Sequence, residues 1–192
     1  MYPKARLDAL SDSIFGVAMT LLALDVRLPD EFQPRDAQDL VRALAGLGPK
    51  LLPYALSFGV LGLRWLSNIH LRSVGESCSR GYANWWLVYH LLITFVPFTT
   101  IVLGRFISFA PAIWLYAGNT ILISAVSYRL LALTPAFERA DHLRDRRFSL
   151  GLLIVSSLLA IGWSFVSPQQ AIWALALNIA APIVSRRIIG TD

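Results

Sequence analysis

The stretch Asp12-Ser-Ile-Phe-Gly-Val-Ala-Met-Thr-Leu-Leu-Ala-Leu-Asp25 decides the class of this protein. Its two aspartates bracket 12 uncharged residues, which as a helix span only about 18 Å at roughly 1.5 Å per residue. The hydrocarbon core of a bilayer is about 30 Å thick. A helix that crosses it here carries Arg6, Asp8, Asp12 or Asp25 into or near the hydrocarbon. Such groups usually face a bundle interior or a water-filled path, so we expect this helix inside the protein, as a pore or relay element.

The rest of the chain has the composition of a membrane protein. Of its 192 residues 56% are hydrophobic and 15% are charged, with a mean hydropathy of +0.58, which is far more apolar than a soluble domain. Uncharged stretches long enough to cross a bilayer recur along it. We predict one all-α integral membrane domain over residues 1–192. Its six spans are expected at about 6–28, 50–72, 82–104, 106–130, 148–167 and 169–187, with a short external amphipathic helix at 36–47 that Asp36 caps.

Basic residues set the expected orientation of these spans. With the N-terminus inside, 11 lysines and arginines fall on cytoplasmic segments and 5 on external ones. We therefore expect both termini in the cytoplasm. The same bias accounts for the net charge of +5 without nucleic acid, because no basic patch is interleaved with stacking aromatic residues. A secretory signal peptide is disfavoured because Asp8 and Asp12 lie where such peptides are rarely acidic.

No pattern in the sequence indicates an enzyme, a metal site or a cofactor. No nucleophile triad, phosphate loop or paired-carboxylate pattern occurs. The three histidines have no metal-ligand spacing, and hydrogen-bonded packing is the ordinary interpretation of His70 and His90. Trp85 and Trp86 are typical of an interfacial aromatic belt. The single cysteine, Cys78, says little about the redox compartment.

The opening of the first span resembles a known family. Arg6-Leu-Asp-Ala-Leu-Ser-Asp12, followed by the apolar helix, resembles the Arg-x-x-x-Phe-Ser-Asp signature of the prokaryotic transmembrane protein 175 family. Arg6, Ser11 and Asp12 match this signature, whereas Leu10 replaces its phenylalanine.

Two later stretches agree with the same resemblance. The segment 65–72, which starts at Trp65, is similar to the family's Trp-x-x-His/Asn-His-Arg region, with Asn68 present and Ile69 where a histidine is common. Val96-Pro-Phe-Thr-Thr-Ile-Val-Leu-Gly104 is similar to its Pro-Phe-Pro-Thr-x-x-Leu-Gly segment. The resemblance covers Arg6 to about Arg105, and beyond that it rests on the number of helices.

The resemblance implies a potassium-permeable cation channel, selective or weakly selective, in a prokaryotic inner membrane. It implies a homotetramer of six-helix subunits in which four copies of the first helix line a central pore. Potassium is the permeant ion, and no cofactor is implied. Apolar side chains of the first helix replace a carbonyl filter, and counting from Asp12 places the constriction at Val17, Leu21 and Leu24, with a hydroxyl at Thr20. The spacings of four and three residues put 17, 21 and 24 on one helical stripe.

A tight apolar ring gates by dewetting, because leucine cannot replace the water shell of an ion. Thr20 is the only polar side chain between Ser13 and Asp25, so we assign it the weak preference for potassium. Without the family, ordinary packing between helices is the favoured interpretation of Val17, Leu21 and Leu24, and the resemblance reverses that preference.

The signature residues have a different expected role, which is to join helices. We expect the Asp12 carboxylate to meet an indole N–H, an amide or a guanidinium of the second span, which satisfies a charge that lipid cannot. The members of this predicted inter-helix network are Arg6, Leu10, Ser11, Asp12, Arg64, Trp65, Asn68 and His70.

Two other classes of protein stay open at this stage. Asp12, Asp25 and the histidines could act as proton relays, which is a reason to consider a proton-coupled secondary transporter. No paired broken helices in matching halves support that alternative. A non-conducting membrane scaffold or a membrane-embedded enzyme is the third class, and no residue of the sequence points to it.

Overall fold

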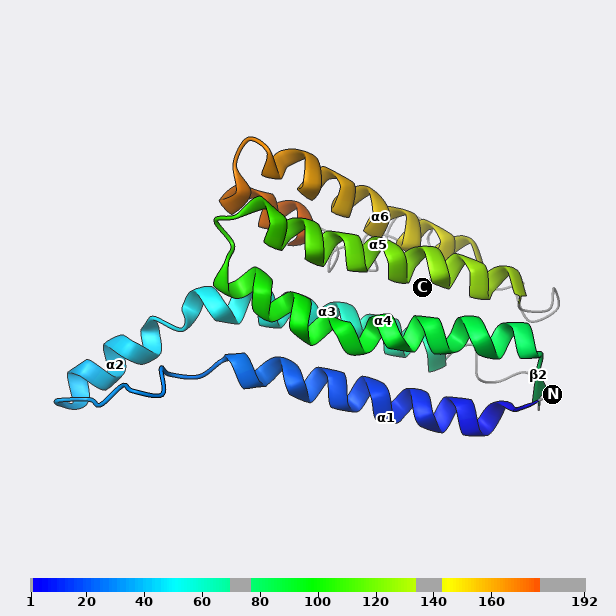
Figure 1. Cartoon of the computed structure of the whole chain (residues 1–192), viewed down its shortest axis with the longest axis horizontal. Helices are drawn as coiled ribbons and strands as arrows, with labels where there is room; N and C mark the ends of the chain where they lie inside the picture. The colour runs from blue at the N-terminus through cyan, green and yellow to red at the C-terminus, as the bar shows by residue number, and fades with distance from the viewer. Residues whose placement is uncertain (1, 70–76, 134–142, 177–192) are drawn as a thin grey trace, which may run out of the picture.

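The computed structural model describes residues 2–69, 77–133 and 143–176. The chain order is β1 (Tyr2–Pro3), α1 (Lys4–Leu22), η1 (Ala23–Asp25), α2 (Ala37–Ala45), α3 (Gly48–Ile69), β2 (Ser77–Cys78), α4 (Arg80–Arg105), α5 (Ala110–Leu133) and α6 (Leu143–Ser164). Residues 168–176 are helical as well. The architecture is a helical bundle in which long helices run side by side (Figure 1).

Four described helical segments are long and apolar enough to cross a membrane: Lys4–Asp25, Arg80–Arg105, Ala110–Leu133 and Arg146–Ser164. A fifth crossing results if α2 and α3, which meet at a bend of 48°, count as one broken span. The expected sixth span at 169–187 lies partly outside the described residues. α1 with η1 reaches the length of a span only by including Asp8, Asp12 and Asp25, as expected from the sequence.

Local sequence explains where two of the helices begin. The Asp36 carboxylate accepts a hydrogen bond from the backbone N–H of Asp39 at 2.7 Å and caps α2. The Ser79 hydroxyl accepts from the N–H of Tyr82 at 3.1 Å and caps α4. Each cap satisfies an N–H that the first helical turn leaves without a partner.

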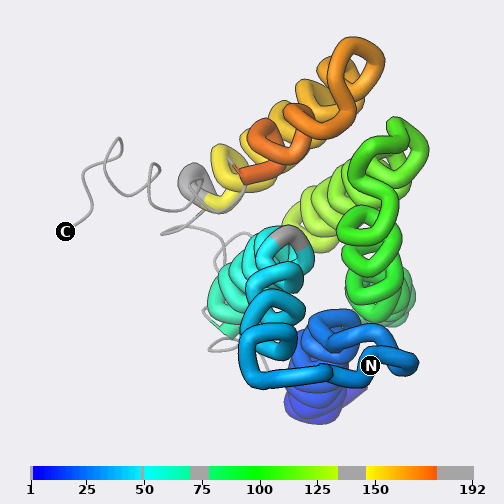
Figure 2. The backbone as a smooth tube through the Cα atoms, turned by 90° about the vertical axis from the view of Figure 1, so that its left-hand side faces the viewer, coloured from blue at the N-terminus to red at the C-terminus, as the bar shows by residue number. Residues whose placement is uncertain are grey.

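The helices are layered so that α1 lies at one edge of the bundle. α1 packs on α4 and α3, α4 on α5, and α5 on α6, and the end-on view in Figure 2 shows α1 and α6 at opposite ends of this arrangement. The core beneath α1 is apolar and buried: Phe15, Ala18 and Leu22 are each 1% exposed, and they meet Leu61 of α3 and Ile93 of α4.

α1 and α4 run parallel and are joined at both ends. At one end β1 pairs antiparallel with β2, which places Tyr2 opposite Cys78 and Pro3 opposite Ser77. At the other end Asp25 forms an ion pair with Arg105, with 2.8 Å between Oδ1 and Nη2. The short strand pair was not expected from the sequence.

Candidate functional site: the first helix and its polar contacts

One face of α1 carries the residues that bind it to its own subunit. Ser11, Phe15, Ala18 and Leu22 are buried and recur at intervals of four, three and four residues, which is the period of a single helical face. Asp25 continues this face into η1 and is also buried. The sequence therefore dedicates one side of the helix to packing on α3 and α4.

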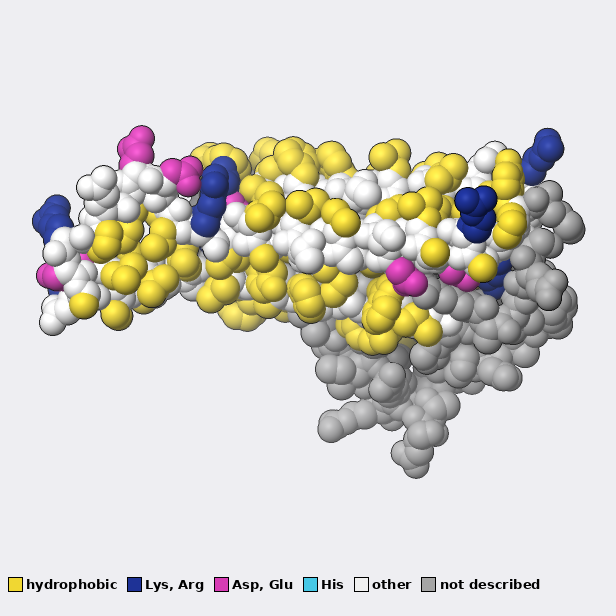
Figure 3. All heavy atoms as spheres, turned by 90° about the horizontal axis from the view of Figure 1, so that it is seen from below, with side chains coloured by type: hydrophobic (Ala, Val, Ile, Leu, Met, Phe, Trp, Pro, Cys, Tyr) yellow, Lys and Arg dark blue, Asp and Glu magenta, His cyan; other side chains and the backbone are white. Residues whose placement is uncertain are grey.

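The opposite face of α1 carries Val17, Thr20 and Leu21, three of the four residues expected at the constriction, and the fourth, Leu24, follows in η1. Val17 is 57% exposed, Leu21 is 40% exposed and Leu24 is 65% exposed, and Thr20 is exposed between them. The Thr20 hydroxyl donates to the carbonyl of Val17 at 2.8 Å, so its oxygen lone pairs stay free. Figure 3, which looks onto the α1 side of the molecule, shows a long surface of hydrophobic side chains with charged ones gathered towards the ends.

The Asp12 carboxylate is held by the second long helix of the chain, α3. The indole N–H of Trp65 donates to its Oδ1 at 2.7 Å. A charge-assisted hydrogen bond of this length is a strong one. The structure thus brings together Asp12 and Trp65, one of the pairs expected from the signature, and it joins α1 to α3.

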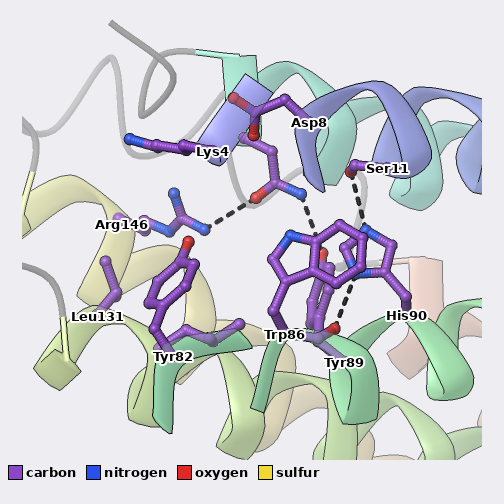
Figure 4. A pocket seen from close by; sticks show the side chains of 11 residues that line it. Lys4, Asp8, Ser11, Tyr82, Trp86, Tyr89, His90, Leu131 and Arg146 are labelled. Carbon is purple, nitrogen blue, oxygen red and sulfur yellow. Dashed lines mark hydrogen bonds between the residues drawn. The ribbon is translucent and has the colours of Figure 1, made fainter. Parts of the chain in front are cut away.

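Ser11 joins α1 to α4 through His90. Nδ1 of His90 lies 2.9 Å from the Trp86 carbonyl, and Nε2 lies 2.8 Å from the Ser11 hydroxyl. A carbonyl only accepts, so Nδ1 carries the proton, and the neutral ring accepts the Ser11 O–H at Nε2. The Trp86 ring stacks on the imidazole with 3.8 Å between ring centroids, and Figure 4 shows the three side chains converging.

The remaining members of the expected network lie elsewhere. Arg64 is buried and donates from Nη2 to Ser124 of α5 at 3.1 Å, rather than to Asp12. Asn68 faces Tyr89, with 3.5 Å between Nδ2 and the phenol oxygen, and accepts from Arg146 of α6 at 3.1 Å. These contacts join α3 to α4, α5 and α6 instead of to α1.

Two signature positions are exposed, and one lies outside the described residues. Arg6 is on the surface and Leu10 is 45% exposed. Both lie on the side of α1 that also carries Val17 and Leu21. His70 is not among the described residues.

A small polar cavity of about 40 Å³ lies at the N-terminal end of α1. It is large enough for a few water molecules, and Ser11, His90, Trp86, Asn68 and Arg146 are among its lining residues (Figure 4). Among the described residues, no group of three or more His, Cys, Asp or Glu side chains is placed to hold a metal ion.

Sequence reasoning did not find two participants in this site. Trp86 is 5% exposed and packs on His90, so its assignment to an interfacial belt was wrong. Arg146 is one of the 11 basic residues expected on cytoplasmic segments, yet it also donates to the Asn68 side chain at 3.1 Å. The spacing of four residues between Trp86 and His90, which places both on one face of α4, is the signal that could have indicated their contact.

These features define a multi-pass helical membrane protein whose first helix is fixed by polar contacts on one face and turns an apolar stripe away from its own subunit. Comparison with known proteins also indicates a membrane protein of this kind. The family model described as endosomal/lysosomal potassium channel TMEM175 matches residues 6–97. The resemblance to the transmembrane protein 175 family that the sequence predicts is therefore confirmed over these residues.

Two bacterial relatives match most of the chain. The protein named potassium channel Cha6605_3372 of Chamaesiphon minutus is 28% identical over 176 residues, which cover 84% of both chains. The protein named potassium channel B446_29190 of Streptomyces collinus is 28% identical over 190 residues, 92% of this chain and 90% of that one. The mouse protein named endosomal/lysosomal proton channel TMEM175 is 34% identical over 83 residues, 38% of this chain and 17% of that one.

A solved structure has the same fold. The crystal structure of a lysosomal potassium-selective channel TMEM175 homolog from Chamaesiphon minutus matches with a TM-score of 0.77 and 28% identity, and the match covers 94% of this chain and 97% of that chain. These relatives and this structural neighbour are all named as ion channels, not as enzymes.

Proposed function

We propose that this chain is a potassium-permeable cation channel, assembled as a homotetramer with four copies of α1 around a central pore. The observation that carries the proposal is the division of α1 and η1 into a buried face and an outward apolar stripe at Val17, Leu21 and Leu24. A single subunit cannot enclose a pore with one such helix, whereas closed cyclic symmetry gathers copies of it around an axis. Potassium is the proposed permeant ion because both bacterial relatives are named potassium channels.

In this proposal, each subunit is one six-span domain over residues 1–192, in a prokaryotic inner membrane with both termini in the cytoplasm. Rings of Val17, Leu21 and Leu24 form a constriction that excludes water when narrow. Thr20 contributes four hydroxyl oxygens between these rings, which can replace part of an ion's water shell. The contacts of Ser11 and Asp12 fix the rotation of α1 about its own axis. They therefore orient Val17, Leu21 and Leu24 towards the centre of the pore.

The proton-coupled transporter is less well supported than the channel. The side chains that favoured it have fixed partners: Asp12 accepts from Trp65, Asp25 is paired with Arg105, and His90 is held by Ser11 and Trp86. A relay needs groups that exchange partners as a proton moves. No described residue points to a scaffold or to an enzyme.

Single-channel recording in liposomes, in potassium and sodium gradients, tests the proposal with two adjacent leucines. Leu21→Ala widens the constriction, so we expect higher conductance and a weaker preference for potassium. Leu22 is the matched control because it is 1% exposed on the packed face. Leu22→Ala should lower the free energy of unfolding by about 2–5 kcal/mol and leave the reversal potential unchanged. Equal shifts of reversal potential in both variants would refute this pore assignment, and a purely monomeric mass in detergent would refute the assembly.

A further inference from the structure

α2 has an apolar face that its own subunit leaves open. No residue of α2 is buried: Leu40 is 37% exposed, Val41 is 65% exposed and Leu44 is 50% exposed. These three side chains share one side of the helix, whereas Gln38 and Arg42 lie on the other. Such a division is typical of a helix that packs on something else.

α2 also lies beyond the end of the bundle. Figure 1 shows it projecting past the ends of α1, α4, α5 and α6. The same end of the bundle carries exposed aromatic side chains, with Trp114 40% exposed, Trp163 55% exposed and Phe165 71% exposed. Exposed tryptophans mark the level of the membrane interface. The apolar face of α2 therefore lies past that level, where water would surround it.

The charge and tilt of the α2 segment do not suit a lipid surface. Residues 26–47 contain four acidic side chains and three basic ones, whereas helices that bind membranes are basic on their polar face. Such helices also lie in the plane of the interface, yet α2 is bent by only 48° from α3, which crosses the membrane in the proposed channel.

We infer that α2 packs through Leu40, Val41 and Leu44 on a second copy of this chain, at the outer rim of the assembly. The inference rests on the proposed oligomer. The exposed apolar stripe of α1 continues into η1 and ends at Leu24, and α2 projects from the same end of the bundle (Figure 1). A copy packed around α1 therefore reaches α2, and the contact removes three apolar side chains from water.

Native mass spectrometry of the full chain over a dilution series tests this contact. We expect Leu40→Ser/Leu44→Ser to dissociate at about a hundredfold higher protein concentration than the parent, since each buried leucine contributes about tenfold or more to association. Gln38→Ser/Arg42→Ser places the same residues on the opposite face and should behave as the parent. Both variants should fold, because α2 buries nothing within its subunit. Equal dissociation of the two variants would overturn the inference.

A fluorophore on Leu44→Cys, in a Cys78→Ser background, identifies what covers this face. In liposomes we expect protection from both aqueous iodide and brominated lipid, while the same label on Gln38→Cys is quenched by iodide. Quenching at position 44 by iodide means an open face, and quenching by brominated lipid means a membrane contact. Either result in an intact oligomer overturns this inference alone. A parent that is only monomeric overturns the proposed channel as well.

Discussion

The Arg105 guanidinium, on the last residue of α4, donates from both Nε and Nη2 to Oδ1 of Asp25, at 3.0 and 2.8 Å. The Asp25 side chain is 10% exposed and that of Arg105 is 49% exposed, so a largely buried carboxylate is neutralised by a half-exposed cation. This pair fixes the C-terminal end of the first helix against α4.

Removing this cation leaves the Asp25 charge buried without its partner. We expect Arg105→Ala to lower the free energy of unfolding in detergent by about 1–2 kcal/mol, less than for a fully buried pair because water screens Arg105. Arg27→Ala is the control, since Arg27 and Asp30 lie 3.4 Å apart with side chains 60% and 76% exposed, and such surface pairs contribute little. Equal losses in the two variants would contradict a role for Asp25 in fixing α1.

The indole N–H of Trp65 provides a second test, because phenylalanine keeps the ring and removes the donor. Trp65→Phe should destabilise the subunit by about 1.5–3 kcal/mol, the range for a hydrogen bond to a charged group. Asp12→Asn weakens the same bond, and assembly and conductance should suffer with it. Trp85→Phe changes a 39% exposed tryptophan and should have little effect. An Asp12→Asn channel that assembles and conducts like the parent would count against the anchoring role.

Substitution of two serines on α1, one buried and one exposed, distinguishes the loss of a buried contact from the loss of a surface hydroxyl. Ser11→Ala removes the O–H donor to the buried His90 ring, so we expect a loss of about 1–3 kcal/mol in the free energy of unfolding. Ser13 is exposed, and its hydroxyl donates to the carbonyl of Ala9 within the same helix at 3.1 Å. Ser13→Ala should change stability by less than about 0.5 kcal/mol. Thermal unfolding of both variants in one detergent decides the matter, and a stable Ser11→Ala protein would contradict the expectation.

The Thr20 hydroxyl is expected to tune ion preference. Thr20→Val keeps the shape of the side chain and removes the oxygen, so the preference for potassium over sodium should fall. Thr94→Val is the matched control, since Thr94 of α4 is exposed and donates to its own helix at Leu91 over the same 2.8 Å. Reversal potentials under bi-ionic conditions report the difference. Unchanged selectivity in Thr20→Val would assign potassium preference to other groups.

Much of the helical arrangement could be predicted from local sequence. The α2 helix and its Asp36 cap follow from apolar spacing and one capping residue, and α4 at Arg80–Arg105 agrees with the expected 82–104. The β1–β2 pair could not be predicted, because two-residue strands are too short for an alternating pattern. Its partners are also brought together only by the packing of α1 on α4.

Contacts of the site could be predicted where a side chain can pair with only a few kinds of group. A carboxylate near hydrocarbon needs a donor, and Trp65 of the signature region supplies it. The identity of the outward face of α1 did not follow from hydropathy, because Phe15, Ala18 and Leu22 are as apolar as Val17, Leu21 and Leu24. Only the resemblance to a family chose between the two faces. The Ser11–His90 contact links positions 79 residues apart, and no local sequence pattern indicates it.

Joining α1 to α4 at both ends restricts the ways in which α1 can move. Sliding along its axis, as a piston does, would break the β1–β2 pair at one end and the Asp25–Arg105 pair at the other. Bowing of the middle of the helix breaks neither of them. Gly16 lies in that middle, and a Cβ added there would meet no neighbouring atom within 4 Å. Glycine lowers the resistance of a helix to bending. If a gate is built on this helix, it would therefore open by bending near Gly16 while both ends of the helix stay attached to α4.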